Sequence, residues 1–485
     1  MKNEKIVENY VLNLIYQMLT ILLPIITTPY LSRVLGAENI GIYGYTISIV
    51  TYFTLLGALG ITKYGQREIA YVQNDRAKRS KIFWELNIIK FFTVSVASII
   101  FFCVFCIKGK YVLFYRILLL ELFAVVMDIS WFFQGIEDFK KVVIRNSTIK
   151  LVSLICIFLL VKTQDDLLEY FIIYILSNVI GNALFWVNIK KYIDKVSFKN
   201  IKLKKHIKPM ISLFIPQIAA SIYTVLDKTM LGYLESDISE VGYYEQSQKI
   251  VKVALTFVTA LSIVMIPRIS NVYAKGDSKK IKDYMVKSFT FDWFLSCPII
   301  FGIIAIADKF VPWFFGAGYD KIIYLLIYSS PIVIFISLST TIGSQYFTSI
   351  KKQHIQTIAV IVGAIINVVL NILLIPSLKS YGAVISTVVA ELIITTIEVI
   401  YLIRVEKFSF KDITTGTMKY ILAGFIMFIF IKVLSGFMNI SALNTIIQIV
   451  AGLFIYIFTL VLLKDKWVNI ILKKIISFKK ESDIL

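Results

Sequence analysis

The stretch KKYIDKVSFKNIKLKKHIKP, Lys190–Pro209, separates two long apolar halves of the chain. It holds eight lysines and one aspartate, without a glutamate, and is the longest polar segment in the sequence. The runs on its two sides resemble each other in order and length. Because short, lysine-rich connections stay on the cytoplasmic side of a membrane, the stretch predicts a cytoplasmic linker between two similar membrane-embedded halves.

The composition predicts that lipid surrounds most of the chain. Of the 485 residues, 58% are hydrophobic and 17% are charged, which is more apolar surface than a soluble fold of this size buries. The net charge of +20 is carried by Lys and Arg that cluster between the apolar runs, which favours a basic membrane face over nucleic-acid binding. The chain has two histidines, and its four cysteines all lie within apolar runs. We therefore expect no metal site and no cofactor.

Apolar segments of about 20 residues are long enough to cross a hydrocarbon core of about 30 Å, and they predict about fourteen transmembrane helices. Six precede the linker, at 9–33, 40–62, 82–107, 111–134, 140–161 and 167–189. Eight follow it, at 209–234, 241–266, 284–307, 322–350, 355–376, 381–403, 413–436 and 441–463. The predicted fold class is thus an all-α integral membrane protein.

The same spans predict the domain organisation, with two six-helix repeats and two added helices. Because six spans precede the linker, both halves enter the membrane from the same side, and the repeats are expected to be parallel. A shift of about 201 residues places Gly41 on Gly242 and Arg67 on Arg268. The predicted segments are an N-terminal lobe at 1–189, the linker at 190–208, a C-terminal lobe at 209–406, two further helices at 407–463 and an amphipathic basic tail at 464–485.

The connections between spans alternate between basic ones and short ones poor in Lys and Arg. This bias predicts that both termini are cytoplasmic. All of the connections are short, so none leaves room for a soluble catalytic domain. The chain also lacks a phosphate-binding G-x-x-x-x-G-K-[ST] loop, which predicts a protein that is not an enzyme and carries no ATPase of its own.

Several motifs occur in a familiar order. Pro24 and Pro29 lead into LSRVLGAENIGIYGY, which is followed by REIA, by DISWFFQGIEDFKK and by NVVLNILLIPSLKSYGAVIS, at 31–45, 67–70, 128–141 and 367–386. Over nearly the whole chain this order resembles the polysaccharide-repeat-unit (Wzx-type) flippases of the multidrug/oligosaccharidyl-lipid/polysaccharide exporter superfamily. The drug exporters share the fold, so the fold alone assigns no substrate.

The resemblance implies two six-helix lobes around a central cavity, which open alternately to the two sides of a bacterial cell membrane. It implies transfer of undecaprenyl-pyrophosphate-linked oligosaccharide from the inner to the outer leaflet, for capsule, O-antigen or exopolysaccharide. Membrane lipid and other polysaccharide-assembly proteins are the implied partners. A multidrug/cation antiporter of the same fold is the alternative. A membrane glycosyltransferase or polymerase is disfavoured, because it would need acidic catalytic residues on a long external loop.

Charged and amide side chains within the spans are candidate site residues, because an ionisable group at bilayer depth is costly unless it faces protein or water. No catalytic residue is expected. Several cations suit a pyrophosphate, and the substrate-binding candidates are Arg33, Arg67, Lys150, Lys228, Lys249, Lys252 and Arg268. The cavity-lining or ion-pairing candidates are Glu121, Asp128, Arg145, Asp227, Asn367, Asn371 and Glu391.

Two further expectations concern these charges. Arg33, Arg67 and Arg268 lie near span ends, so for them a structural role, with the long side chain reaching the interface, is an equal alternative to substrate binding. Asp128 and Lys150 lie at similar depths on consecutive antiparallel spans, and an ion pair between them would reduce the cost of burying each.

Overall fold

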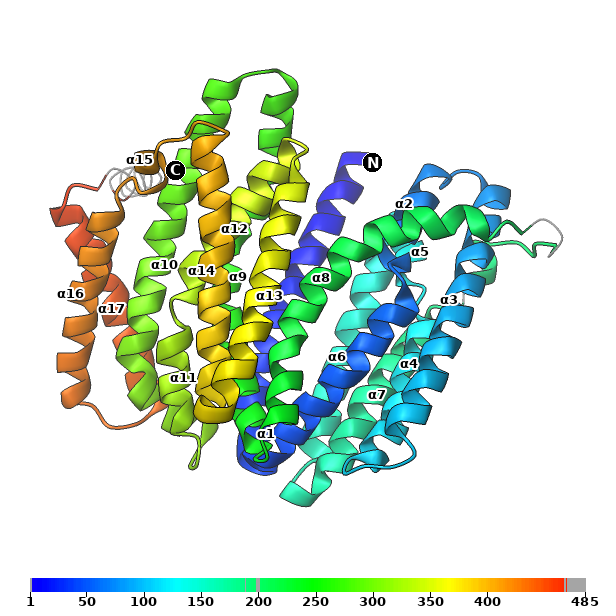
Figure 1. Ribbon diagram of the computed structural model, residues 1–485, viewed down its shortest axis with the longest axis horizontal. Helices are drawn as coiled ribbons and strands as arrows, with labels where there is room; N and C mark the ends of the chain where they lie inside the picture. The colour runs from blue at the N-terminus through cyan, green and yellow to red at the C-terminus, as the bar shows by residue number, and fades with distance from the viewer. Residues whose placement is uncertain (1, 188, 198–200, 466–467, 469–485) are drawn as a thin grey trace, which may run out of the picture. The chain divides into compact units, whose positions relative to one another are not determined.

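The computed structural model describes residues 2–187, 189–197, 201–465 and 468 (Figure 1). The chain divides into two compact units, Met1–Gly242 and Tyr243–Leu485. The described residues are helical nearly throughout and include no strand, so the predicted all-α class is confirmed. The division between the units falls after the linker and the helix that follows it, and the predicted lobe boundaries stay a prediction.

The first unit is a bundle in which the first helix contacts most of the others. The helix α1 packs against α3, α4, α6 and α8, while α4 packs against α7, and α2 packs against α5. Its elements are α1 (Lys2–Ala58), α2 (Ile61–Tyr71), α3 (Arg76–Phe105), α4 (Val112–Met127), α5 (Ser130–Gly135), α6 (Phe139–Leu160), η1 (Gln164–Asp166), α7 (Leu167–Leu184), η2 (Ile189–Lys191) and α8 (Lys204–Leu234).

The first two predicted spans join within α1 at a kink instead of a loop. Gly36 interrupts the helix with φ 77° and ψ 170°, a backbone conformation that is essentially restricted to glycine. Figure 1 shows α1 turning sharply along its length. The single missing side chain at Gly36 therefore allows two spans to follow each other with almost no connecting residues.

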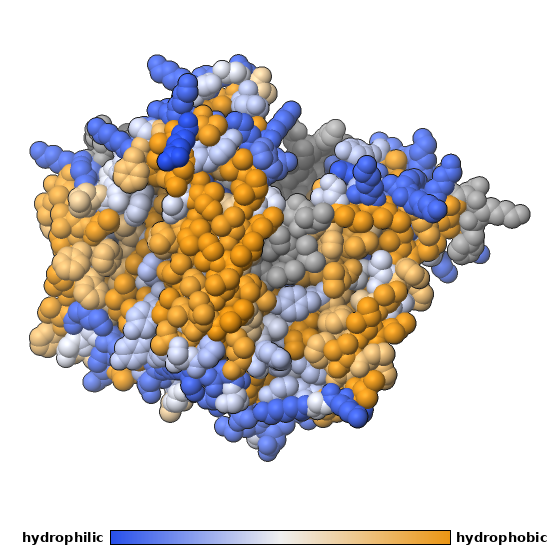
Figure 2. All heavy atoms as spheres, in the orientation of Figure 1, coloured by the Kyte–Doolittle hydropathy of each residue, from blue (hydrophilic) through white to orange (hydrophobic). Residues whose placement is uncertain are grey.

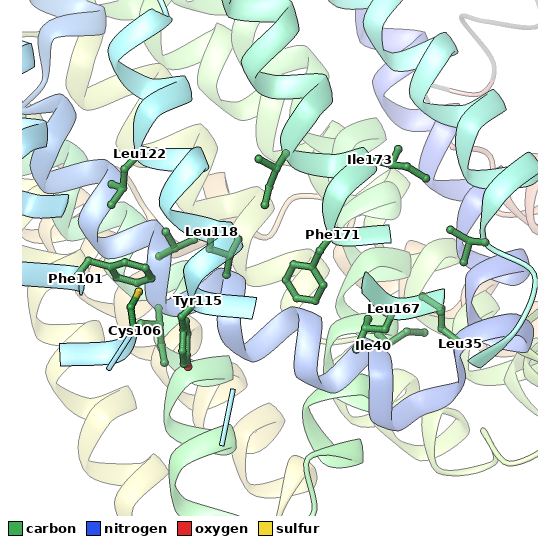
Figure 3. Packing of buried hydrophobic residues seen from close by; sticks show 14 of the residues in the cluster. Leu35, Ile40, Phe101, Cys106, Tyr115, Leu118, Leu122, Leu167, Phe171 and Ile173 are labelled. Carbon is green, nitrogen blue, oxygen red and sulfur yellow. The ribbon is translucent and has the colours of Figure 1, made fainter. Parts of the chain in front are cut away.

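Apolar side chains from α1, α3, α4 and α7 form the largest core of this unit. Phe101, Cys106 and Tyr115 lie together at one end of the cluster, as Figure 3 shows, and Leu118 lies next to them. Phe171 of α7 is fully buried in the same cluster. Cys106 is part of this packing, in keeping with the behaviour of a buried thiol as a small apolar group.

The linker is bound to the first unit by hydrogen bonds. The Arg79 guanidinium donates to the Tyr192 carbonyl at 2.7 and 3.2 Å. The Asp194 amide donates to the Ser80 hydroxyl at 2.8 Å, and the Arg76 guanidinium pairs with the Asp194 carboxylate at 3.0 Å. Residues 190–194 therefore lie against the start of α3.

A buried cluster binds the start of α8 in the same way, and we refer to Tyr64, Glu85, Lys205 and His206 as the Glu85 cluster. The two nitrogens of His206 lie 2.8 Å from the Tyr64 hydroxyl and 2.9 Å from the Glu85 carboxylate. The Lys205 ammonium lies 2.9 Å from the same carboxylate, and the Lys202 amide donates to its other oxygen at 2.8 Å. One buried carboxylate thus holds three donors of the segment that enters α8.

The second unit contains α-helices of varied length and one π-helical segment. The helix α10 packs against α11, α12, α16 and α17, and α13 packs against α14. The elements are α9 (Ser239–Ala274, which begins at the end of the first unit), α10 (Ser278–Phe315), α11 (Lys321–Ser329), α12 (Ile332–Ser339), η4 (Thr340–Phe347), α13 (Gln353–Leu378), α14 (Ser380–Arg404), α15 (Phe410–Ile413), α16 (Thr417–Gly436) and α17 (Ala442–Leu462).

Eleven segments of the described chain are long and apolar enough to cross a membrane. One of them, at 16–71, contains two predicted spans, and α4 has only 16 residues. The number fourteen therefore stays a prediction. On the face in Figure 2, apolar residues cover the helix flanks and hydrophilic residues gather at the helix ends, as expected of a membrane protein. The predicted tail at 464–485 lies almost wholly outside the described residues.

The predicted shift of about 201 residues matches a reciprocal contact between α1 and the start of α9. A Cβ atom added to Gly41 would lie 2.0 Å from the Ile238 carbonyl oxygen, and one added to Gly242 would lie 2.0 Å from the Ala37 carbonyl oxygen. Residue 238 is also the repeat equivalent of residue 37. Equivalent residues thus make equivalent contacts, which is the property of a locally two-fold crossing.

Replacing either glycine of this crossing by alanine should destabilise the protein by about 1–3 kcal/mol, because the new methyl group overlaps rigid backbone. We expect Gly41→Ala and Gly242→Ala to lower the thermal unfolding midpoint in detergent to a similar extent. Gly436→Ala is the matched control, since no atom lies within 4 Å of its added Cβ. Equal midpoints for all three variants would contradict the close approach.

Candidate functional site

Two adjoining cavities lie inside the first unit, between α1, α6, α7 and the segment that joins α4 to α6. Their volumes are about 260 and about 280 Å³. Both are lined by Ile149, Lys150, Ser177 and Asn178, so we treat them as one chamber and name it the α6 cavity. Its position within predicted spans makes it a polar space at membrane depth.

One end of the α6 cavity is rich in amides and hydroxyls, whereas the other end is more apolar. Such a lining can bind a ligand that carries many hydroxyl groups and an anionic group. The polar end is lined by Tyr16, Asp128, Ser130, Gln134, Val142, Arg145, Asn146 and Asn182. The other end is lined by Thr20, Leu23, Pro24, Thr27, Ser153, Leu154, Ile157 and Tyr174.

Arg145 is held in place by neutral groups. Its Nε donates to the Gly181 carbonyl at 2.6 Å, and its terminal nitrogens donate to the side-chain carbonyls of Asn146 and Asn182. The guanidinium also stacks over the Phe185 ring at 4.3 Å. Because none of these partners is charged, the orientation of Arg145 is fixed while its positive charge stays available to the cavity.

Lys150 is the second cation of the α6 cavity, about 1.4 turns further along α6 than Arg145. Its ammonium lies 5.0 Å from the centre of the Tyr16 ring, a distance at which cation and ring attract. Within the described part of the chain, no carboxylate forms an ion pair with it. The cavity therefore holds one cation that is fixed by amides and one that rests on an aromatic ring.

Asp128 lines the same cavity, at the break between α4 and α5. Its Oδ1 accepts from the Ser130 amide at 2.9 Å, and its backbone carbonyl accepts from the buried Lys90 ammonium. The predicted ion pair with Lys150 is not formed, although both residues reach one chamber. The reason is that α4 ends at Met127, so the Asp128 carboxylate caps the next turn.

Glu121 acts on the cavity through an intermediate residue. The side-chain amide of Asn178 donates to both oxygens of Glu121, at 3.0 and 3.1 Å, and Asn178 lines the chamber. Asn182 donates in turn to the Ala124 carbonyl at 2.8 Å. Contacts from α4 thus fix the orientation of two α7 amides in the wall.

The remaining candidates of the first unit lie outside the α6 cavity. Arg33 and Arg67 are exposed, and Arg67 pairs with the neighbouring Glu68 at 3.0 Å. Its guanidinium also lies over the Tyr64 ring. Asp227 is buried and Lys228 is partly buried on α8. A role for these four residues in binding stays a prediction.

The candidates of the second unit are divided among three helices. On α9, Lys249 lies 3.8 Å from Glu245, whereas Lys252 and Arg268 are exposed. On α13, the buried Asn371 donates to Asn367 at 3.1 Å. Glu391 and Glu398 are buried on α14. Their roles also stay predictions, and the α6 cavity contains none of them.

Sequence reasoning missed most of the neutral wall of the cavity. Asn146 and Lys150 are four residues apart on α6, and Asn178 and Asn182 are four residues apart on α7. Residues at that spacing share a helix face. The motif S-N-V-I-G-N at 177–182 therefore predicts a stripe of polar side chains along one face of α7. The amides chosen as candidates, Asn367 and Asn371, lie on another helix, and the α7 stripe stands out less than a charge because amides are less costly in a membrane than ions.

The comparisons with known proteins agree with this architecture. A protein from Escherichia coli K12 named as an O-antigen transporter is 24% identical over 392 residues, covering 78% of this chain and 92% of that protein. A Haloferax volcanii protein named as a low-salt glycan biosynthesis flippase is 24% identical over 301 residues, 61% of each chain. The solved lipid II flippase MurJ in an inward closed conformation superposes with a TM-score of 0.74 at 18% identity, covering 93% and 99% of the two chains.

Family models match in two overlapping regions. The model described as MatE matches residues 213–373, which is about a third of the chain. The model described as polysaccharide biosynthesis protein matches residues 6–273, which is more than half of the chain and includes the whole α6 cavity. The chain therefore belongs to the polysaccharide biosynthesis protein family.

Proposed function

We propose that this protein is a flippase that moves lipid-linked oligosaccharide from the inner to the outer leaflet of a bacterial cell membrane. The observation that carries the proposal is the α6 cavity, a chamber at membrane depth with two cations and a wall of amides and hydroxyls. The names of the glycan-transporting relatives support it. The proposed activity is transport and not catalysis.

The cavity chemistry fits the polar head of such a substrate. The anionic linkage, a pyrophosphate in the proposed substrate, pairs with Lys150 and Arg145, since charge-assisted hydrogen bonds to phosphate are strong where water is scarce. Sugar hydroxyls exchange hydrogen bonds with Asn146, Asn178 and Asn182. The polyprenyl chain is apolar and stays in the lipid, so only the head enters the protein.

The lobes are proposed to expose the substrate first to the cytoplasmic and then to the outer side, as repeat-built transporters do. We propose that both termini and the linker lie in the cytoplasm, because the basic connections gather on that side. Enzymes that assemble and polymerise the same repeat unit are the proposed partners.

The alternative, a multidrug/cation antiporter, is supported by the MatE match at 213–373. The charges of the α6 cavity oppose it, because Lys150 and Arg145 outnumber the single carboxylate of Asp128 in the wall. A cationic drug would be repelled there.

The deciding experiment compares cells with and without this protein. We expect lipid-linked repeat units to accumulate on the cytoplasmic side when the protein is absent, as measured by mass spectrometry of extracted lipids and by glycosidase access to inverted vesicles. Complementation should restore polymer at the cell surface. Unchanged lipid-linked intermediates together with a raised sensitivity to cationic drugs would favour the antiporter instead.

The two lysines of α9 give a separate prediction. Replacing Lys249 and Lys252 together by glutamine removes two charges from one helix, and we expect the variant to insert normally but to export little polymer if these lysines contact the pyrophosphate. Surface polymer and membrane levels of the protein measure the two effects. The matched control is Lys279→Gln with Lys280→Gln, which removes two exposed lysines from the start of α10. Export at the wild-type rate would show that Lys249 and Lys252 of α9 do not contact the substrate.

A further inference from the structure

Among the described residues of the second unit, Asp292 and Glu398 are buried carboxylates with oxygens that have no hydrogen-bond partner. Asp292, on α10, is 1% exposed, and its Oδ2 has no hydrogen-bond partner. A charged carboxylate in this position would cost several kcal/mol. Such an unsatisfied group in a folded protein needs a physical explanation.

The surroundings of Asp292 are two facing rows of small polar side chains. The row on α10 consists of Ser288, Asp292 and Ser296 at four-residue spacing. The facing row, on α12 and η4, consists of Ser337, Thr341 and Gln345 at the same spacing. The Gln345 amide donates to the Ser288 hydroxyl at 2.8 Å, which fixes the register. The Asp292 carboxyl then faces the hydroxyls of Thr341 and Ser337.

The facing row continues from α12 into η4, the π-helical segment Thr340–Phe347. π-Helical turns are rare and occur frequently at functional sites. In this region Ser296 Oγ, Ser337 Oγ and Gln345 Oε1 are also buried without a hydrogen-bond partner. Ser262 of α9 lies 3.2 Å from the Thr341 hydroxyl, so three elements meet around the carboxyl.

No cation forms an ion pair with Asp292 among the described residues, and most charged and phenolic groups on neighbouring elements have partners of their own. Glu398 of α14 lies against Gly343 of η4, and both of its carboxylate oxygens are also buried without a hydrogen-bond partner. The buried thiol of Cys297 lies five residues further along α10 than Asp292. The other groups pair as follows: Tyr346 with Glu406, Lys282 with Asp412, Lys432 with Asp308, Lys419 with the Leu463 carbonyl, Tyr420 with Asp465, Tyr456 with the Phe294 carbonyl, and Lys321 with the Tyr381 ring.

We propose that Asp292 is a proton-binding site that is protonated in this conformation and releases its proton to water when the second unit rearranges. The acid O–H bond breaks, the electron pair stays on the carboxylate, and the proton leaves as hydronium. The protonated form explains the burial, since a neutral carboxyl donates one hydrogen bond to a facing hydroxyl. Coupling of this proton to substrate movement rests on the proposed flippase function, whereas the proton site itself does not.

Infrared spectroscopy of the full-length protein in liposomes of phosphatidylethanolamine and phosphatidylglycerol tests the site without any substrate. We expect a carbonyl stretch of a protonated, buried carboxyl that disappears between low and high pH. Asp292→Asn, which copies the shape of the neutral acid, should remove the band. Asp308→Asn, on the same helix but paired with Lys432, should leave it unchanged. Thr341→Val should shift the band, because it removes a facing hydroxyl.

Three results would overturn the proposal. The band could persist in Asp292→Asn, it could vanish instead in Glu398→Gln, or it could be abolished at fixed pH by sodium chloride but not by choline chloride. The last result would assign a sodium site. Coupling is measured by export of repeat units with and without a pH gradient. An intact band in a protein that moves no lipid-linked oligosaccharide would reject the flippase function and leave the proton site standing.

Discussion

Replacing Lys150 by glutamine should reduce the rate at which repeat units reach the outer leaflet by about tenfold or more. A hydrogen bond to a charged group contributes about 1.5–3 kcal/mol, and every 1.4 kcal/mol corresponds to about a factor of ten. Lys150 is the cation of the α6 cavity that is not fixed by hydrogen bonds to the wall. The loss of its charge should therefore weaken binding of the anionic head directly.

The variant should still fold, because Lys150 rests on the Tyr16 ring and takes part in no ion pair within the described chain. Accumulation of lipid-linked intermediates, measured by mass spectrometry, reports the transport step. Lys150→Arg should retain most of the activity. Lys162→Gln is the matched control, since it removes an exposed lysine just beyond the other end of α6. Wild-type export by Lys150→Gln would exclude the α6 cavity from the substrate path.

Replacing Glu85 by glutamine should lower the stability of the first unit by about 2–3 kcal/mol, the scale for hydrogen bonds to a buried charged group. The Glu85 side chain is fully buried, and it accepts from the Lys202 amide and contacts Lys205 and His206. In Glu85→Gln, the side-chain NH2 group of the glutamine would place hydrogen-bond donors against the donors of Lys202, Lys205 and His206. The expected result is a lower thermal unfolding midpoint in detergent and faster tryptic cleavage in the linker.

Two controls separate the buried carboxylate from a general charge effect. Glu38 is exposed on α1, and Glu38→Gln should leave both measurements unchanged. Lys205→Gln should have a small effect of about 0.5 kcal/mol, because this partner is partly exposed to solvent. If Glu85→Gln behaves like Glu38→Gln, the Glu85 cluster does not hold the linker.

The Glu85 cluster attaches the end of the linker to helices of the first unit. His206 lies before the predicted seventh span, and burial lowers the pKa of its imidazole while the bonded Glu85 opposes this change. A neutral imidazole can accept from the Tyr64 hydroxyl and donate to the carboxylate, which satisfies both ring nitrogens. The start of α8 is therefore tied to α2 and α3, and it moves with the first unit instead of acting as a free tether.

The amino-acid sequence alone determined the membrane class and the positions of most helices, and it predicted the repeat. These properties depend on the length of apolar runs and on the placement of lysines, which are local and one-dimensional quantities. The repeat shift even identified Gly41 and Gly242, which meet in the reciprocal contact of α1 and α9. The lysine-rich linker was also predicted from the sequence as a cytoplasmic connection, but its contacts with α2 and α3 were not.

Only the tertiary structure decided which polar groups meet. Helical spacing predicts the face on which Lys150 or Asn178 lies, but not which helix faces it, because that depends on crossing angles and on breaks such as the end of α4 before Asp128. The pairing of Asp128 with Lys150 was expected from equal depth, and that break prevented it. Glu85 and His206 lie 121 positions apart, and Asp292 meets Thr341 across the two facing rows of the second unit. Such contacts arise from packing in three dimensions, which no periodicity along the chain encodes.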